Sequence, residues 1–159
     1  MKTKLFIVAT CALMLIAAGC KDKTPVEPEL DPIAGNVEKP SWIAPESYDM
    51  TASMTAVIKV DLSQTYPKQV EKEGWKTSEG DLIAAFSGET CIGVDTLGAD
   101  RADLFFLFMS GLNEGDIEDV QLRYYSMQLK NIFKATELIP FRNDAELGSV
   151  SEPYTPEFK

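Results

Sequence analysis

The side chains that could do chemistry in this 159-residue chain are mostly carboxylates, because the sequence contains no histidine. Without imidazole the chain lacks the usual general base, the usual activator of a serine or cysteine nucleophile and the commonest transition-metal ligand. Two acids facing each other across a cleft can still hydrolyse a glycosidic bond. Asp81, Asp95 and Asp103 are candidates for such a pair, but their spacing selects no two of them. We therefore expect a protein that is not an enzyme, with a carboxylate-dependent glycoside hydrolase as the alternative.

The acidic residues around position 100 also raise the question of calcium. Asp95, Asp100 and Asp103 offer the oxygen ligands that calcium prefers. Their spacing does not match a twelve-residue EF-hand loop, and the bidentate glutamate that ends such a loop is missing. The same holds for a second acidic turn, which contains Asn113, Glu114 and Asp116. Both stretches are typical of solvated loops, and we predict no metal and no cofactor.

A long polar stretch, residues 63–80, carries the most suggestive aromatic residues. It is interrupted by Pro67 and Gly74, and it holds Tyr66 and Trp75 among lysines and glutamates. Long loops inside compact domains tend to be functional or mobile. We predict that Tyr66 and Trp75 bind a ligand. The competing interpretation, given equal weight, is that both rings fold back and cap one end of the core.

The amino terminus has the layout of an export signal. A short basic start, residues 1–4, precedes an apolar run over residues 5–18 that is too short to cross a bilayer comfortably. This pattern is typical of a secretory signal peptide, which we place at residues 1–19.

The end of this run, Ala17-Ala18-Gly19-Cys20, resembles the cleavage site of bacterial lipoproteins. The family usually has leucine where this chain has Ala17, with Ile16 one place earlier. In that family a peptidase cuts before the cysteine, which becomes the lipidated first residue. The resemblance implies a lipid on Cys20, a membrane as partner and a place in the cell envelope. The charged residues 21–23 are similar to signals that send some lipoproteins of Bacteroidetes-type bacteria to the outer face of the outer membrane, so surface exposure is favoured over a periplasm-facing location.

Residues 20–40 form the predicted tether between lipid and domain. The segment is rich in proline and acid and has no apolar period, so we expect it to be extended and solvated. In polyproline geometry, at about 3.1 Å per residue, it could reach roughly 60 Å from the membrane. The globular domain is then residues 41–159. If Cys20 carries lipid, Cys91 is the cysteine left in that domain, and we expect a buried, inert thiol.

The net charge of the chain limits the kinds of partner that it can bind. The chain carries a net charge of -10, and loss of Lys2 and Lys4 with the signal peptide would bring it to about -12. Such an acidic body repels phosphate backbones, which argues against nucleic acid as a partner.

The sequence of the domain predicts a succession of strands. Residues 50–62 alternate between apolar and polar side chains, which predicts a strand with one buried face. Residues 81–94 predict a buried hairpin, and residues 104–109 a central strand buried on both faces or under long side chains. Further strands are predicted at 120–125, 131–135 and 137–141, the last at an edge because of Pro140. From Gly148 the tail lies along the surface or frays. The expected fold is all-β, an antiparallel β-sandwich of about 7–9 strands.

The domain also resembles an uncharacterised repeat found in surface proteins of Bacteroidetes-type bacteria. The matching residues are Trp42, Met54, Asp81, Ile83, Ala84, Ala85, Phe86, Gly88, Cys91, Gly93, Phe141, Asp144, Leu147 and Gly148. The likeness spans about residues 42–153, and one departure is Ile92, where that family often has arginine. It implies a β-sandwich and no transferable activity. In addition, Asp95-Thr96-Leu97 looks like the short O-glycosylation acceptor of such envelope proteins, with Thr96 as the modified residue.

These features predict a non-catalytic, membrane-anchored binding or structural module whose ligand is a glycan or another envelope protein. Besides the hydrolase, a subunit of a surface fibre or adhesin remains as an alternative. That protein should show an unpaired strand edge or groove, with the Pro140 strand as the first place to look.

Overall fold

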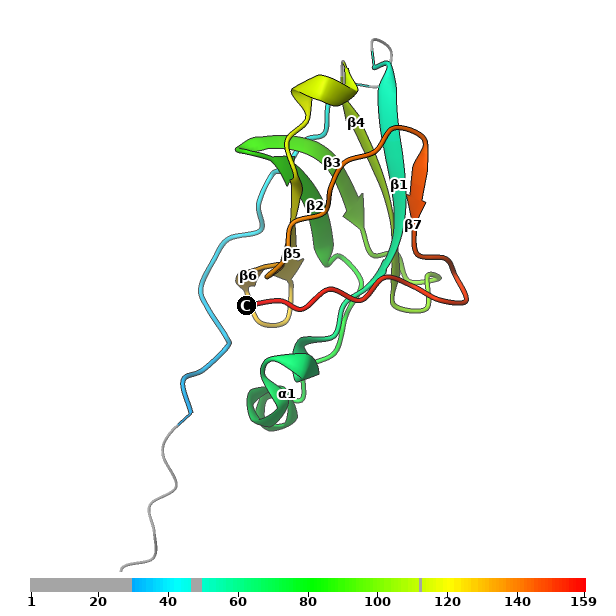
Figure 1. Cartoon of the computed structure of the whole chain (residues 1–159). Helices are drawn as coiled ribbons and strands as arrows, with labels where there is room; N and C mark the ends of the chain where they lie inside the picture. The colour runs from blue at the N-terminus through cyan, green and yellow to red at the C-terminus, as the bar shows by residue number, and fades with distance from the viewer. Residues whose placement is uncertain (1–29, 47–49, 112) are drawn as a thin grey trace, which may run out of the picture.

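The computed structural model describes residues 30–46, 50–111 and 113–159. Those residues form seven strands in two sheets, with one short α-helix (Figure 1). The prediction of an all-β sandwich is confirmed. The predicted signal peptide, Cys20 and half of the predicted tether, residues 20–29, lie outside the described residues.

The first sheet has three strands in the order β4-β1-β7. Its central strand is β1 (Ala52–Lys59), which pairs antiparallel with β4 (Leu104–Gly111) and parallel with β7 (Ala145–Leu147). The predicted alternation along β1 is confirmed, because its even-numbered side chains are buried. The parallel β1–β7 pair departs from the purely antiparallel expectation.

The second sheet has four antiparallel strands in the order β3-β2-β5-β6. They are β2 (Leu82–Ser87), β3 (Thr90–Thr96), β5 (Val120–Ser126) and β6 (Asn131–Lys134). The predicted hairpin is the β2–β3 pair. Its two-residue turn begins at Gly88, whose φ of 56° is a left-handed conformation that glycine adopts without steric cost.

The core between the sheets is centred on the ring of Tyr124 on β5. Phe105, Phe133 and Phe158 surround it, with ring centroids 5.9–6.2 Å from the Tyr124 centroid. These aromatic contacts join strands from both sheets, and they add to the hydrophobic stabilisation that burial provides.

The two sheets approach each other closely at β3 and β4. A Cβ on Gly93 would lie 2.4 Å from the backbone oxygen of Phe108, so no larger residue fits there. The carboxylate of Asp95 on β3 accepts a hydrogen bond from the backbone N–H of Phe106 on β4, at 2.7 Å. Asp95 therefore links the two sheets.

On the opposite side the carboxyl-terminal tail joins the sheets. Tyr154 pairs with β1, and Lys159 exchanges two backbone hydrogen bonds with Lys134 of β6. Phe158 between them is fully buried. The predicted tail on the surface is therefore wrong for its last residues, which fill the core.

Two strand predictions are also wrong. Strand β4 is not buried on both faces, because Phe106 and Phe108 are 44% and 48% exposed on the outer face of the three-stranded sheet. Residues 137–141 form no strand. Ile139 makes one bridge to Val120, and Pro140 has no N–H with which to continue the ladder.

The long polar stretch contains structure that the sequence did not predict. It begins with a 3-10 turn, η2 (Leu62–Gln64), followed by α1 (Pro67–Glu73). The helix has proline at its first position and ends at Gly74 in the left-handed conformation. Both are ordinary end signals, but seven residues are too few to show a helical period.

The segment before β1, residues 30–46, is named here the lead segment. The predicted solvated tether reached residue 40, but from Ile33 onward the lead segment lies on the domain. Ile33 is 4% exposed, and the backbone N–H groups of Gly35 and Val37 donate to carbonyls of the β5–β6 turn at 2.8 Å. Residues 34–39 are exposed to solvent, as predicted for the tether, but the prediction did not include this docking, because the contact is made mainly by the backbone.

Candidate functional site

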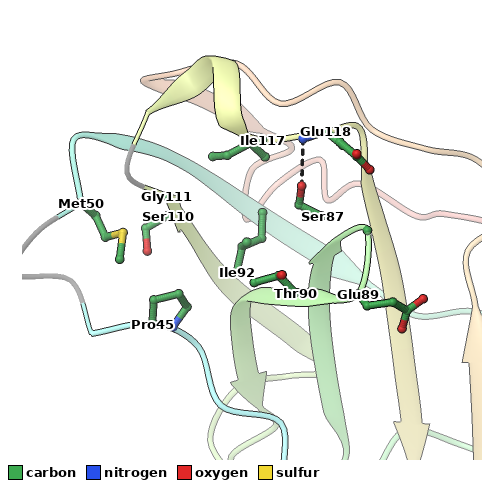
Figure 2. Close-up of a pocket in the computed structure, with 11 residues that line it drawn as sticks. Pro45, Met50, Ser87, Glu89, Thr90, Ile92, Ser110, Gly111, Ile117 and Glu118 are labelled. Atoms are coloured by element: carbon green, nitrogen blue, oxygen red, sulfur yellow. Dashed lines mark hydrogen bonds between the residues drawn. The ribbon is translucent and has the colours of Figure 1, made fainter.

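A cavity lies at one end of the sandwich, beside the β2–β3 turn (Figure 2). Its volume is about 530 Å³, and it is lined by Pro45, Met50, Ser87, Gly88, Glu89, Thr90, Ile92, Ser110, Gly111, Ile117 and Glu118. The antiparallel pairing of Ser87 with Val120 brings the hairpin turn and the β4–β5 connection to the same end of the sheet. We call this site the hairpin-end cavity.

Local contacts fix the shape of the hairpin-end cavity. The hydroxyl of Ser87 accepts a hydrogen bond from the backbone N–H of Glu118 at 2.8 Å, which fastens the connection to the hairpin (Figure 2). The side chain of Ile117 lies over Gly111, where a Cβ would be 2.5 Å from Ile117 Cδ1. Because Gly111 has no side chain, Ile117 can lie over it and form one wall of the cavity.

The lining combines apolar walls with a small number of hydroxyl groups. Pro45, Met50, Ile92 and Ile117 supply apolar surface, and Thr90 supplies a hydroxyl at the exposed rim. Ser110 is only 2% exposed. Such a mixture is typical of sites that bind a small molecule or one side chain of a partner.

The two carboxylates of the lining do not face each other across the cavity. Glu89 is 91% exposed, and its carboxylate lies 3.4 Å from the guanidinium of Arg123, outside the cavity. In Figure 2 the Glu118 side chain also points away from Ile92 and Ser110. A glycosidase pair needs carboxyl groups on either side of one bond, and this geometry does not provide it.

Asp81, the first candidate acid, is fully buried and has a structural environment. Its carboxylate accepts hydrogen bonds from the backbone N–H groups of Ser78 and Met127, at 2.9 and 2.8 Å, and from the hydroxyls of Ser78 and Tyr124, at 3.1 and 2.5 Å. Burial, with the Asp81 carboxylate beside it, raises the pKa of the Tyr124 hydroxyl. Asp81 thus caps the turn before β2 and ties that turn to the core.

The remaining candidate acids are dispersed. Asp95 forms an ion pair with Arg101 at 2.6 Å, in addition to its bond to β4. Asp103 accepts a hydrogen bond from the Thr77 hydroxyl at 2.8 Å. Glu114, in the turn η3 (Glu114–Asp116), accepts one from the backbone of Asn143. Among the described residues there is no group of three or more acids or cysteines placed to hold a metal ion.

Tyr66 and Trp75 lie at the opposite end of the sandwich, around α1. The Trp75 indole packs edge-on against Tyr124 at 6.3 Å, and its N–H donates to the Ser126 hydroxyl at 3.2 Å. The Tyr66 ring contacts Phe133 at 6.0 Å. This packing favours the interpretation that both rings cap the core, and ligand binding by them stays a prediction.

Cys91 and Thr96 are both on β3. Cys91 is half-buried, and burial raises the pKa of its thiol. Thr96 is exposed, whereas its neighbour Leu97 is buried. O-glycosylation of Thr96 stays a prediction.

The hairpin-end cavity was not predicted from the sequence, although the hairpin and the acidic turn after β4 were. The missing information was the β2–β5 pairing, which joins residues more than thirty positions apart.

The fold places the described part of the chain among all-β sandwich domains. Comparisons with protein-family models, with curated proteins and with solved structures found no match. Within residues 30–46, 50–111 and 113–159, no helix combines the length and apolar character of a membrane span.

Proposed function

We propose that this chain is a non-catalytic lipoprotein of the bacterial envelope, anchored through lipid on Cys20, whose domain binds a ligand in the hairpin-end cavity. The proposed place is the outer membrane, with the domain on the cell surface. The ligand is a glycan or another envelope protein. The anchor rests on Ala17-Ala18-Gly19-Cys20, and the binding role rests on the cavity.

The observation that carries the binding role is the chemistry of the cavity lining. Four apolar side chains form its walls, and the hydroxyls of Thr90 and Ser110 lie among them. A ligand with an apolar face and a few hydroxyl or amide groups would fit such walls, and both a sugar and a peptide meet that description.

The test of binding uses two glycine variants with the same chemical change. Gly111→Ala places a methyl group against Ile117 and pushes that side chain toward the cavity, whereas a Cβ on Gly115 meets nothing within 4 Å. Thr90→Trp is a second blocking variant, at an exposed strand position that tolerates an aromatic residue. Each variant is applied to a glycan array and used to capture proteins from envelope extracts, after circular dichroism confirms its fold.

We expect Gly111→Ala and Thr90→Trp to weaken binding about tenfold or more, a loss of about 1.4 kcal/mol, and Gly115→Ala to bind like the natural chain. Equal binding by all three variants would contradict a role for the cavity. Hydrolysis of any glycan on the array would support the carboxylate hydrolase instead.

The lipid anchor has its own test. Growth with labelled palmitate should label the protein, and Cys20→Ala should abolish the label. A labelled Cys20→Ala protein would rule out the assignment.

A further inference from the structure

The lead segment runs along the four-stranded sheet from one end of the sandwich to the other (Figure 1). Its first contacts are at the α1 end. There the backbone N–H of Gly35 donates to the Leu129 carbonyl at 2.8 Å, and the Asn131 side-chain amide donates to the Ile33 carbonyl at 3.0 Å. The β5–β6 turn that receives them also holds the end of α1, through bonds from the Gln128 amide to the carbonyls of Glu73 and Gly74.

Further contacts follow along the sheet toward the cavity. The Val37 carbonyl accepts a hydrogen bond from the Tyr125 hydroxyl, and the Lys39 ammonium donates to the Gly80 carbonyl. The Trp42 ring then packs edge-on against Phe86 at 5.7 Å, and Pro45 lines the hairpin-end cavity. The segment is therefore fastened at several points over its length.

The lead segment covers part of the outer face of the four-stranded sheet. Leu82, Ala84 and Phe86 of β2 alternate with the core residues Ile83 and Ala85, so they belong to the outer face of the sheet, yet all three are at most 6% exposed. A sheet face in contact with water would leave them accessible. Phe86 is covered by Trp42 of the lead segment, with ring centroids 5.7 Å apart, and by the guanidinium of Arg123, 3.9 Å from the Phe86 centroid, so the lead segment supplies part of the cover of this face.

From these contacts we infer that the docked lead segment orients the domain so that the hairpin-end cavity faces away from the membrane that holds the lipid. This inference rests on the proposed lipid anchor at Cys20. With the segment docked, the chain leaves the domain at the α1 end. About ten residues separate Cys20 from Leu30, and an extended chain of that length spans at most about 36 Å, so the α1 end is held close to the bilayer.

Release of the segment would reverse this geometry. The chain would then leave the domain near Trp42 and Pro45, beside the cavity, and the cavity would face the membrane. Docking therefore selects the class of ligand, namely molecules outside the anchoring bilayer, such as polymeric glycans or proteins, and it excludes lipids of that bilayer.

The experiment measures the depth of two single labels on the lipidated protein in vesicles. Nitroxides are attached to Lys72→Cys on α1 and, separately, to Thr90→Cys at the cavity rim, each in a Cys91→Ser background that leaves Cys20 to its lipid. Both sites are exposed. Vesicles carry a paramagnetic nickel chelate on a fraction of their headgroups, which relaxes only nitroxides close to the membrane surface.

We expect relaxation at position 72 to exceed that at position 90 several-fold. In Gly35→Val the added side chain would collide with the Lys130 carbonyl, which lies 2.9 Å from a Cβ at that position, so the difference should shrink or reverse. Retention of the fold in this variant is checked by circular dichroism.

The outcomes separate the two proposals. Protein that floats with the vesicles but relaxes equally at both positions, or more at position 90, overturns the orientation and leaves the anchor standing. Protein that fails to float overturns the anchor, and the orientation falls with it.

Discussion

Replacement of Phe158 by alanine should strongly destabilise the protein, although this is the residue before the last. Its ring is fully buried and lies 5.9 Å from the Tyr124 ring at the centre of the core. Truncation of a buried phenylalanine costs about 3–5 kcal/mol, through lost burial and the cavity left behind. We expect about 3 kcal/mol, the lower limit, if neighbouring side chains relax into part of the space.

Urea unfolding followed by circular dichroism measures this loss. With a slope of about 2 kcal/mol per molar urea, the midpoint should fall by about 1.5 M. Phe106→Ala is the matched control, because it removes the same ring from a site that is 44% exposed, and it should cost less than about 1 kcal/mol. A Phe158→Ala midpoint equal to that of Phe106→Ala would refute the conclusion that the tail completes the core.

Three other predictions follow from the buried polar groups and from β3. Asp81→Ala leaves the hydrogen-bond donors of Ser78, Tyr124 and Met127 without their acceptor. Because each buried group left unpaired costs about 1–3 kcal/mol, the free energy of unfolding in urea should fall by at least about 3 kcal/mol. A loss under about 1 kcal/mol would contradict the role of Asp81. Burial raises the pKa of the Tyr124 and Tyr154 hydroxyls, so both stay neutral in the folded protein, whereas the same groups in the unfolded chain ionise near pH 10. The free energy of unfolding should therefore be constant up to about pH 10 and fall above it. Phenolate absorbance from all five tyrosines before the protein unfolds would contradict this. Glycosylation at Thr96 predicts that Thr96→Ala lowers the native mass by the mass of a glycan in addition to the change of side chain, and a fall by the substitution alone would remove the assignment.

The strands with a clear side-chain period could be predicted from the sequence. In β1 the alternation from Ala52 to Ile58 reports its one buried face directly, and the turn at Gly88 marks the hairpin. Strand β7 could not be predicted, because its three residues are held by parallel pairing with β1, some ninety positions away. The alternation of apolar and polar residues shows which side chains are buried, but it does not show with which distant strand a segment pairs.

The residues that line the candidate site could be predicted only in part. The hairpin turn was recognised, but its proximity to Gly111 and Ile117 depends on the β2–β5 register. The lead segment was mistaken for tether because its contacts are backbone hydrogen bonds of Gly35 and Val37, which any composition can make. In the same way, Phe106 and Phe108 suggested a buried strand, since hydrophobicity alone does not tell which faces of a sheet are covered.

The position of Phe158 also sets an order of events during biogenesis. Strands β1 and β6 receive partners from residues 154–159, so neither sheet can be completed until those residues have been synthesised. Contacts between such distant positions form late and slowly. The sandwich can therefore close around the Phe158 ring only after residues 154–159 have left the ribosome.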